Sequence, residues 1–181
     1  MKKIVVFNGS PRPGGYSVKL LDKVIEGAQS KGAQVIVCNL NDDGVKGCQG
    51  CNWCMTHTEC LTKDKMSPAL EELRTADGLV SAFPVYFGDI SGQSKLFFDR
   101  LYSFLNLNGP KHPGKKFVSV YTQGNNDPDK YKFIAEKYND FYKMFGWEEI
   151  DTIFSVGGSS GAVLTQEILD RAFEAGCRLA E

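Results

Sequence analysis

Short runs of β-branched and aromatic residues alternate along the chain with longer segments whose apolar residues recur at helical spacing. The runs typical of buried strands are residues 3–8, 33–40, 78–83, 116–122 and 150–156. The segments with helical periodicity are residues 17–31, 64–75, 91–105, 129–145 and 164–179. Because parallel strands need long crossover connections, this order predicts an α/β fold: a doubly wound five-stranded parallel sheet with helices on both faces.

Composition fits one globular domain covering residues 1–181. Hydrophobic residues make up 42% of the chain and charged residues 24%. The net charge of −1 gives no electrostatic reason to expect nucleic acid or an anionic membrane as a partner. The sequence shows neither a signal-peptide pattern after Met1 nor an apolar stretch of about 18 residues. We therefore expect a cytoplasmic protein, whose thiols stay reduced.

The loops that follow the first, third and fourth predicted strands are candidates for ligand binding, since ligands of such sheets bind beyond the carboxyl ends of the strands. The first loop, GSPRPGGYS, offers backbone N–H groups at a helix N-terminus, the hydroxyls of Ser10 and Ser17, and the guanidinium of Arg12. These groups suit a phosphate. The loop lacks the Lys-Ser/Thr of a P-loop and the G-x-G-x-x-G of a dinucleotide site. A plain Gly/Pro turn is the alternative.

Two further loops carry weaker signals. PVYFGDISG, residues 84–92, places Tyr86 and Phe87 where they either border a planar ring or cap the core. TQGNN, residues 122–126, is a small polar turn with room for a ligand. Their positions relative to the first loop strengthen both signals.

A cysteine-rich loop at residues 47–63 has the spacing C-x2-C-x2-C-x5-C. Its cysteines are Cys48, Cys51, Cys54 and Cys60. Four thiolates are the usual ligand set of a [4Fe–4S] cluster, and this spacing differs from the bacterial ferredoxin run. Two alternatives remain open: free thiols, and a zinc site that His57 joins. Cys38 and Cys177 are expected to be buried structural thiols.

Four segments in order resemble the flavodoxin-like NAD(P)H-dependent FMN reductase family: GSPRPGGYSVKLL, CQGCNWCMTHTEC, FPVYFGDISGQSKLFFDRL and YTQGN. Within that family the chain is most similar to the iron–sulfur flavoprotein branch. The resemblance implies a flavodoxin-like sheet with strand order 2-1-3-4-5 and FMN at its carboxyl edge. The residues that would grip the FMN phosphate are Ser10, Arg12 and Ser17. Those that would enclose the flavin ring are Pro84, Val85, Tyr86, Phe87, Gly88, Thr122 and Gly124.

The resemblance further implies an FMN-dependent oxidoreductase that takes electrons from NAD(P)H or a reduced carrier. Its acceptor would be a quinone, a flavin, a metal ion or oxygen. A non-enzymatic carrier fed by ferredoxin through a [4Fe–4S] cluster and FMN is the alternative, and a zinc-stabilised interaction module without flavin is a third. FMN supplies the redox chemistry, so we predict no catalytic acid or base.

The resemblance also implies a homodimer or homotetramer. Helix 91–105 is either a subunit contact or an ordinary core stripe. Because the second predicted strand neighbours the first, we expect the cysteine loop to share the flavin's rim of the sheet.

Overall fold

The computed structural model describes residues 1–157 and 164–181. The sequence GGSSG, residues 157–161, also indicates a rim loop, which lies outside the described residues except for Gly157. The elements in chain order are β1 (Lys3–Asn8), α1 (Tyr16–Ser30), β2 (Gln34–Asn39), η1 (Trp53–Met55), α2 (Ser67–Thr75), β3 (Gly78–Tyr86), β4 (Asp89–Ile90), α3 (Gly92–Arg100), η2 (Leu101–Phe104), β5 (Leu105–Asn106), β6 (Gly109–Pro110), β7 (Lys116–Thr122), α4 (Lys132–Met144), β8 (Glu148–Ser155) and α5 (Gln166–Leu179).

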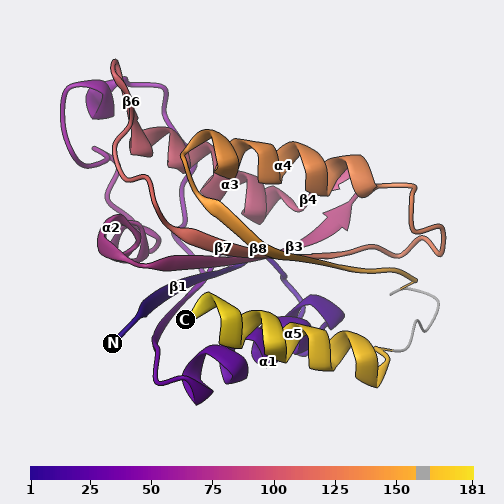
Figure 1. The fold of residues 1–181 in the computed structure, drawn as a ribbon. Helices are drawn as coiled ribbons and strands as arrows, with labels where there is room; N and C mark the ends of the chain where they lie inside the picture. Colours follow the sequence, from indigo (N-terminus) through magenta and orange to yellow (C-terminus); the bar gives the residue numbers. More distant parts are fainter. Residues whose placement is uncertain (158–163) are drawn as a thin grey trace.

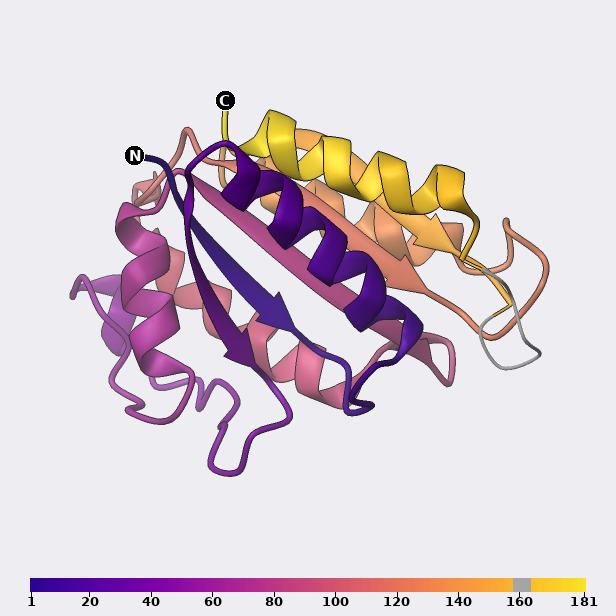
Figure 2. The same ribbon diagram turned by 90° about the horizontal axis from the view of Figure 1, so that it is seen from below.

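The main sheet has the order β2-β1-β3-β7-β8, with these five strands parallel. This confirms the predicted doubly wound sheet and its order 2-1-3-4-5. Helices α1 and α5 cover one face and α2, α3 and α4 the other, as Figure 1 and the view from below in Figure 2 show. Each face has its own apolar core. No helix in the described ranges is long and apolar enough to cross a membrane.

Helices α1 and α5 pack through small residues. A Cβ added at Gly27 would lie 2.0 Å from the carbonyl oxygen of Phe173, and one at Gly176 would lie equally close to that of Val24. The apolar spacing of residues 164–179 predicts that Leu164, Ile168, Phe173 and Cys177 share the covered face. This is wrong in part: Phe173 is 36% exposed and Cys177 only partly buried, while Ala172, Ala175 and Leu179 are buried. Close backbone approach, which only small residues allow, decides which face of α5 is covered.

Strand β3 runs three residues beyond residue 83, where the sequence pattern ends the strand. Its pairing with β1 ends at Ala82, whereas pairing with β7 continues to Pro84. Proline lacks an N–H, but it lies where β3 no longer has a neighbour on the β1 side. The chain then turns into β4, which pairs back on β3. The carboxyl end of β3 thus projects beyond the rim of the sheet.

The predicted third helix, 91–105, ends earlier than its apolar spacing indicates. Helix α3 stops at Arg100, a 3-10 turn follows, and residues 105–110 form a small hairpin of β5 and β6. The start of α3 is fixed by Ser91, whose hydroxyl accepts a hydrogen bond from the N–H of Ser94. Both ends of α3 bear on the sites described below.

Candidate functional site

A cleft of about 290 Å³ opens at the carboxyl ends of β1, β3 and β7. The structure brings together here eight of the ten residues predicted to bind FMN. The lining residues are Ser10, Arg12, Gly15, Tyr16, Ser17, Pro84, Val85, Tyr86, Thr122, Gln123 and Gly124. Three adjacent parallel strands end at this edge, which explains how segments more than a hundred residues apart in the sequence meet.

One end of the cleft is suited to an anion. Helix α1 starts at Tyr16 without a side-chain cap among the described residues and without an acidic residue in its first turn. Its first N–H groups and the positive end of its dipole therefore face the loop that follows β1. Ser10 and Ser17 are buried there, 7% and 2% exposed, and the Ser10 hydroxyl accepts a hydrogen bond from the N–H of Arg12 at 3.2 Å. The loop's own hydrogen bonds therefore help to hold its shape.

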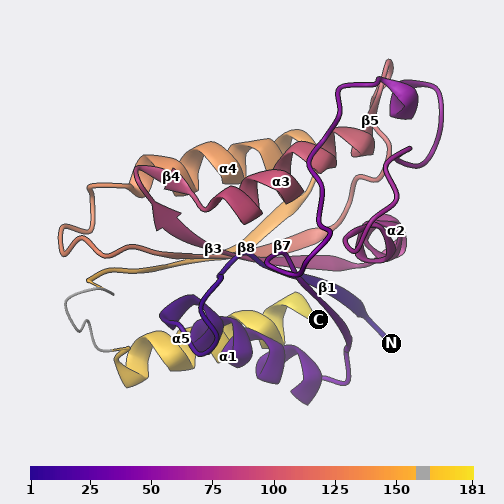
Figure 3. The ribbon, with the colours of Figure 1, turned by 180° about the vertical axis from the view of Figure 1, so that it is seen from behind.

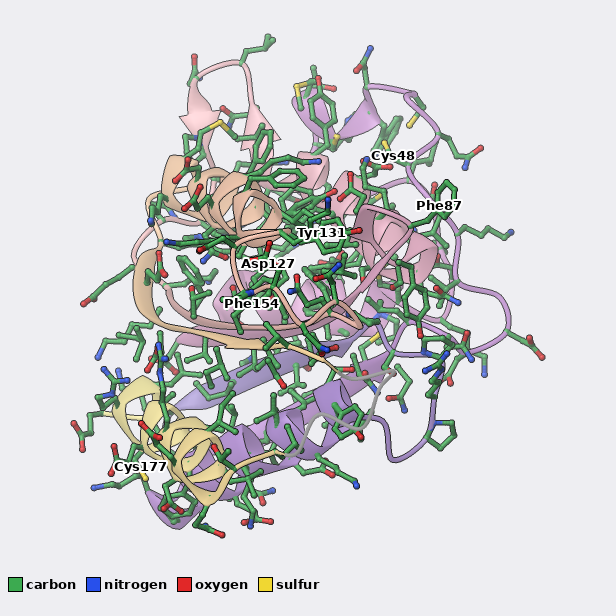
Figure 4. All side chains as sticks on the ribbon, turned by 90° about the vertical axis from the view of Figure 1, so that its right-hand side faces the viewer. Cys48, Phe87, Asp127, Tyr131, Phe154 and Cys177 are labelled. Carbon is green, nitrogen blue, oxygen red and sulfur yellow. The ribbon has the colours of Figure 1, made fainter. Side chains whose placement is uncertain are left out.

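At the other end of the cleft, the β3–β4 turn carries two residues that do not line it. Phe87 has a positive φ of 50° and is fully exposed, and Gly88 follows with a φ of 90°. Figure 4, which looks onto this edge, shows Phe87 at the surface. Helix α4 anchors this turn, because Asp89 accepts hydrogen bonds from Tyr138 at 2.8 Å and from Lys137 at 2.9 Å.

Gln123 was not predicted, although it lies in the TQGNN turn. Its side chain is 2% exposed and lines the cleft. The amide nitrogen donates to the carbonyls of Asn125 and Asp127, at 3.0 and 2.5 Å, while Oε1 has no partner among the described residues. A buried carbonyl without a partner is costly, so this oxygen suits a donor on a bound ligand. The feature of the sequence that could have identified Gln123 is its position directly after a buried strand.

The four clustered cysteines do not lie on this rim, which corrects the expectation from strand order. Asn41 accepts a hydrogen bond from Gln93 in the first turn of α3, and the carbonyl of Lys46 accepts one from Arg100 at its end. The segment between β2 and the cysteines thus runs back along α3, as Figure 3 shows. It carries them to the opposite end of that helix, beside η2 and the β5–β6 hairpin.

All four cysteines line one small pocket, together with Arg100 and Tyr102. Each is a free thiol; Cys48 and Cys51 are exposed and Cys54 is buried. Burial raises the pKa of the Cys54 thiol, partly offset by the charge of Lys111. The side chains of these residues are therefore gathered without being joined by disulfides.

His57 is placed away from this pocket's lining. Its ring stacks on Trp53 at a centroid distance of 3.5 Å, and its Nδ1 lies 3.0 Å from the Trp53 carbonyl oxygen. The described residues contain no group of three or more His, Cys, Asp or Glu side chains placed to hold a single metal ion. A role for Lys111 at this pocket was not predicted from the sequence. Its Nζ donates hydrogen bonds to the carbonyls of Cys54 and His57 at 2.9 and 3.0 Å.

The chain belongs to the NADPH-dependent FMN reductase family, whose sequence profile matches residues 2–129. Among its curated relatives are iron–sulfur flavoproteins, which confirms the expected branch. An iron–sulfur flavoprotein of Archaeoglobus fulgidus is 27% identical over 179 residues, covering 99% of this chain and 79% of the relative. The iron–sulfur flavoprotein MJ1083 of Methanocaldococcus jannaschii is 33% identical over 98 residues, covering 54% of this chain. The chain spans about half the length of this relative, 51%.

Solved structures share the fold at lower identity. An NAD(P)H:quinone oxidoreductase from Methanothermobacter marburgensis superposes with a TM-score of 0.70 at 19% identity, covering 100% of this chain and 98% of the other. An apo NADH:FMN oxidoreductase gives a TM-score of 0.69 at 18% identity, covering 99% and 89%. These likenesses establish the flavodoxin-like architecture.

Proposed function

We propose that this protein is an FMN-dependent oxidoreductase that accepts electrons from NAD(P)H or a reduced carrier and passes them to a small-molecule acceptor. The observation that carries the proposal is the cleft at the carboxyl edge, where eight of the residues predicted from the family resemblance line one space with a phosphate-binding end. Membership of the NADPH-dependent FMN reductase family supports the same assignment.

Different residues would bind the phosphate and the ring of FMN at the two ends of the cleft. Arg12, Ser10 and the first N–H groups of α1 would hold the phosphate of FMN, because a charged fork and a helix N-terminus both favour a dianion. The segment Pro84–Tyr86 and the turn that contains Gln123 would border the ring. The unpartnered Oε1 of Gln123 offers an acceptor for a ring N–H.

When bound, FMN supplies hydride and single-electron chemistry. The chain's own task is to position the ring, to exclude water from its inner side and to leave one side accessible. Phe83 and Tyr121, which directly precede the lining residues Pro84 and Thr122, belong to the apolar core and are each 0% exposed. Burial raises the pKa of Tyr121 far above its ordinary value, and its hydroxyl donates to Asn139 at 3.1 Å, so it stays neutral.

We further propose that Cys48, Cys51, Cys54 and Cys60 hold a [4Fe–4S] cluster. The donor set fits, since four thiols line one pocket whose lining includes no carboxylate and no histidine. A zinc ion needs its ligands gathered around a single point, whereas a cubane binds each thiolate at a different iron. The described residues hold no group of side chains placed for a single ion, so the proposal of a cluster rests on the four thiols of the pocket. The relatives' name, iron–sulfur flavoprotein, agrees.

The second candidate, an electron carrier fed by ferredoxin, is favoured by the placement of the cysteine pocket. Cys48 and Cys51 are exposed and lie at the end of α3 remote from the flavin cleft. A protein donor could therefore reach the cluster without approaching the flavin. Electrons would then enter at one site and leave at the other.

Both functions are tested on protein purified without oxygen, with FMN, iron and sulfide measured per chain. We expect one FMN with about four irons and four sulfides. Steady oxidation of NADH or NADPH by this holoprotein supports the reductase. Indifference to both nucleotides with rapid reduction by ferredoxin supports the carrier instead, and a preparation unable to bind FMN excludes both.

We also propose a homodimer or homotetramer whose contact includes the groove between α3 and α4. This groove is largely apolar and contains Tyr102, Phe141 and Met144, which are 41%, 43% and 50% exposed. Exposed apolar surface of this kind is typical of a subunit contact. Phe141→Asp should lower the mass measured by light scattering to that of a smaller species. Phe173→Asp on α5 serves as the control, and an equal effect of both substitutions would exclude this contact.

A further inference from the structure

Arg100, the last residue of α3, holds together Lys46 and Thr62, which lie on either side of the four cysteines of the cysteine loop. One terminal nitrogen of Arg100 donates to the carbonyl of Lys46 at 3.0 Å and to Asp64 at 2.8 Å. The other donates to the carbonyl of Thr62 at 2.9 Å. A single guanidinium therefore bonds to the chain just before and just after the four cysteines.

Asp64 completes this anchor. Its Oδ2 accepts a hydrogen bond from the N–H of Lys46 at 2.8 Å, and its Oδ1 accepts those of Met66 and Ser67 at 3.1 and 3.0 Å. Burial opposes its ionisation, but the hydrogen bonds from Lys46 and Ser67 and the charge of Arg100 outweigh burial and lower the pKa of Asp64. Both side chains of the pair are 0% exposed. Both terminal nitrogens of Arg100 and both oxygens of Asp64 are hydrogen-bonded, as a buried ion pair requires, whereas Nε of Arg100 has no partner among the described residues.

The same helix contacts the flavin cleft at its other end. Ser91, the N-cap of α3, donates to the carbonyl of Gly9 in the loop after β1 at 2.8 Å. The nine residues of α3 span about 13 Å at 1.5 Å per residue. One rigid helix thus joins the phosphate-binding loop to the anchor of the cysteine loop.

We propose that Arg100 is a positioning residue which, paired with Asp64, fixes the cysteine loop in its ligand-ready shape before any cluster binds. The proposal rests on the cluster site proposed above, but the anchor itself does not need iron. Its bonds run to backbone carbonyls, a carboxylate and a serine hydroxyl. A loop ordered in advance loses less conformational entropy on binding its ligand, so the anchor favours retention of the cluster.

The test compares Arg100→Met and Arg100→Lys with Arg178→Met, which removes an exposed arginine of α5 paired with Asp151. Hydrogen exchange is followed on cluster-free protein, and iron and FMN are measured on reconstituted protein. In Arg100→Met we expect exchange within residues 46–62 to accelerate about tenfold or more, because charged hydrogen bonds to both loop ends are lost. Iron per chain should fall by at least about half, against roughly four in the wild type.

The conservative variant and FMN binding separate positioning from general damage. Arg100→Lys keeps the charge but not the two-pronged geometry, so its exchange and iron content should lie between those of wild type and Arg100→Met. FMN affinity should stay within about twofold of wild type in all three variants, since the flavin cleft lies at the other end of α3. Wild-type exchange and iron content in Arg100→Met would overturn the proposal.

A measurement on the wild type covers the case in which Arg100→Met does not fold. The amides of Lys46, Met66 and Ser67 should stay protected when iron is removed, since Asp64 accepts their hydrogen bonds. Loss of that protection on iron removal would show that the cluster orders the loop, and would overturn the proposal. If no preparation binds iron, the proposed cluster fails, while the exchange comparison still decides the anchor.

Discussion

Substituting Gly9 tests the junction that ties α3 to the phosphate-binding loop. A Cβ at this position would lie 1.9 Å from Ser94 Oγ, 3.1 Å from Ser94 Cβ and 3.2 Å from the carbonyl oxygen of Ala82. The least costly relief is rotation of the Ser94 hydroxyl away from its 2.8 Å contact with Ser91 Oγ. Ser94 is 0% exposed, so the rotated hydroxyl would be buried without a partner.

The magnitude follows from these contacts. A buried hydroxyl left without a partner costs about 1–3 kcal/mol. The remaining short contacts with Ser94 Cβ and with backbone add an overpacking cost of similar size, about 1–3 kcal/mol. Gly9→Ala should therefore lower the free energy of unfolding by about 2–6 kcal/mol. Because Gly9 also begins the loop that would hold the FMN phosphate, the dissociation constant for FMN should rise about tenfold or more.

Urea denaturation of the FMN-free protein and quenching of flavin fluorescence measure the two effects. The control is Gly92→Ala, whose added Cβ meets nothing within 4 Å. It should change neither the free energy of unfolding nor the free energy of FMN binding by more than about 1 kcal/mol. Ser94→Ala removes the atom nearest to the added Cβ. The free energy of unfolding of the double variant Gly9→Ala/Ser94→Ala should therefore be at least about 1 kcal/mol higher than the sum of the two single effects predicts. Wild-type behaviour of Gly9→Ala, or strict additivity of the pair, would refute the reasoning.

Three further outcomes are expected. Arg12→Gln should weaken FMN binding about tenfold or more, with a smaller loss at high salt, as titration at two salt concentrations would show. Cys54→Ser should remove most of the iron and leave FMN bound, whereas Cys177→Ser, at the opposite corner of the molecule from Cys48 in Figure 4, should change neither. Burial lowers the pKa of His112, and the charge of nearby cationic side chains lowers it further, to about 4. Between pH 6.5 and 4 the unfolded chain therefore binds a proton at this residue that the folded chain does not bind. Stability of iron-free protein should thus fall as the pH drops through this range, and less steeply in His112→Gln; equal slopes would contradict this assignment.

The residue pattern predicted the strands and their parallel arrangement, and the family resemblance implied their order and the place of the flavin at the carboxyl edge of the sheet. Predicted FMN-binding residues such as Ser10, Pro84 and Thr122 meet at the cleft because each follows or ends a buried parallel strand. Parallel connections leave few topologies, so position along the chain determines position at the rim. Gln123 was missed because an amide in a polar turn has no distinctive pattern until its burial is known.

What the sequence could not determine is where the long connection after β2 runs. Spacing showed that four cysteines can share one site, but strand order wrongly placed that site on the flavin rim. The path depends on contacts between distant segments, above all the hydrogen bonds of Arg100 with Lys46 and Thr62. Local periodicity predicts helices and strands because side chains return to the same face about every 3.6 residues in a helix and every two residues in a strand. A loop's course is determined by whichever buried partner satisfies its polar backbone, and only the tertiary structure brings that partner into place.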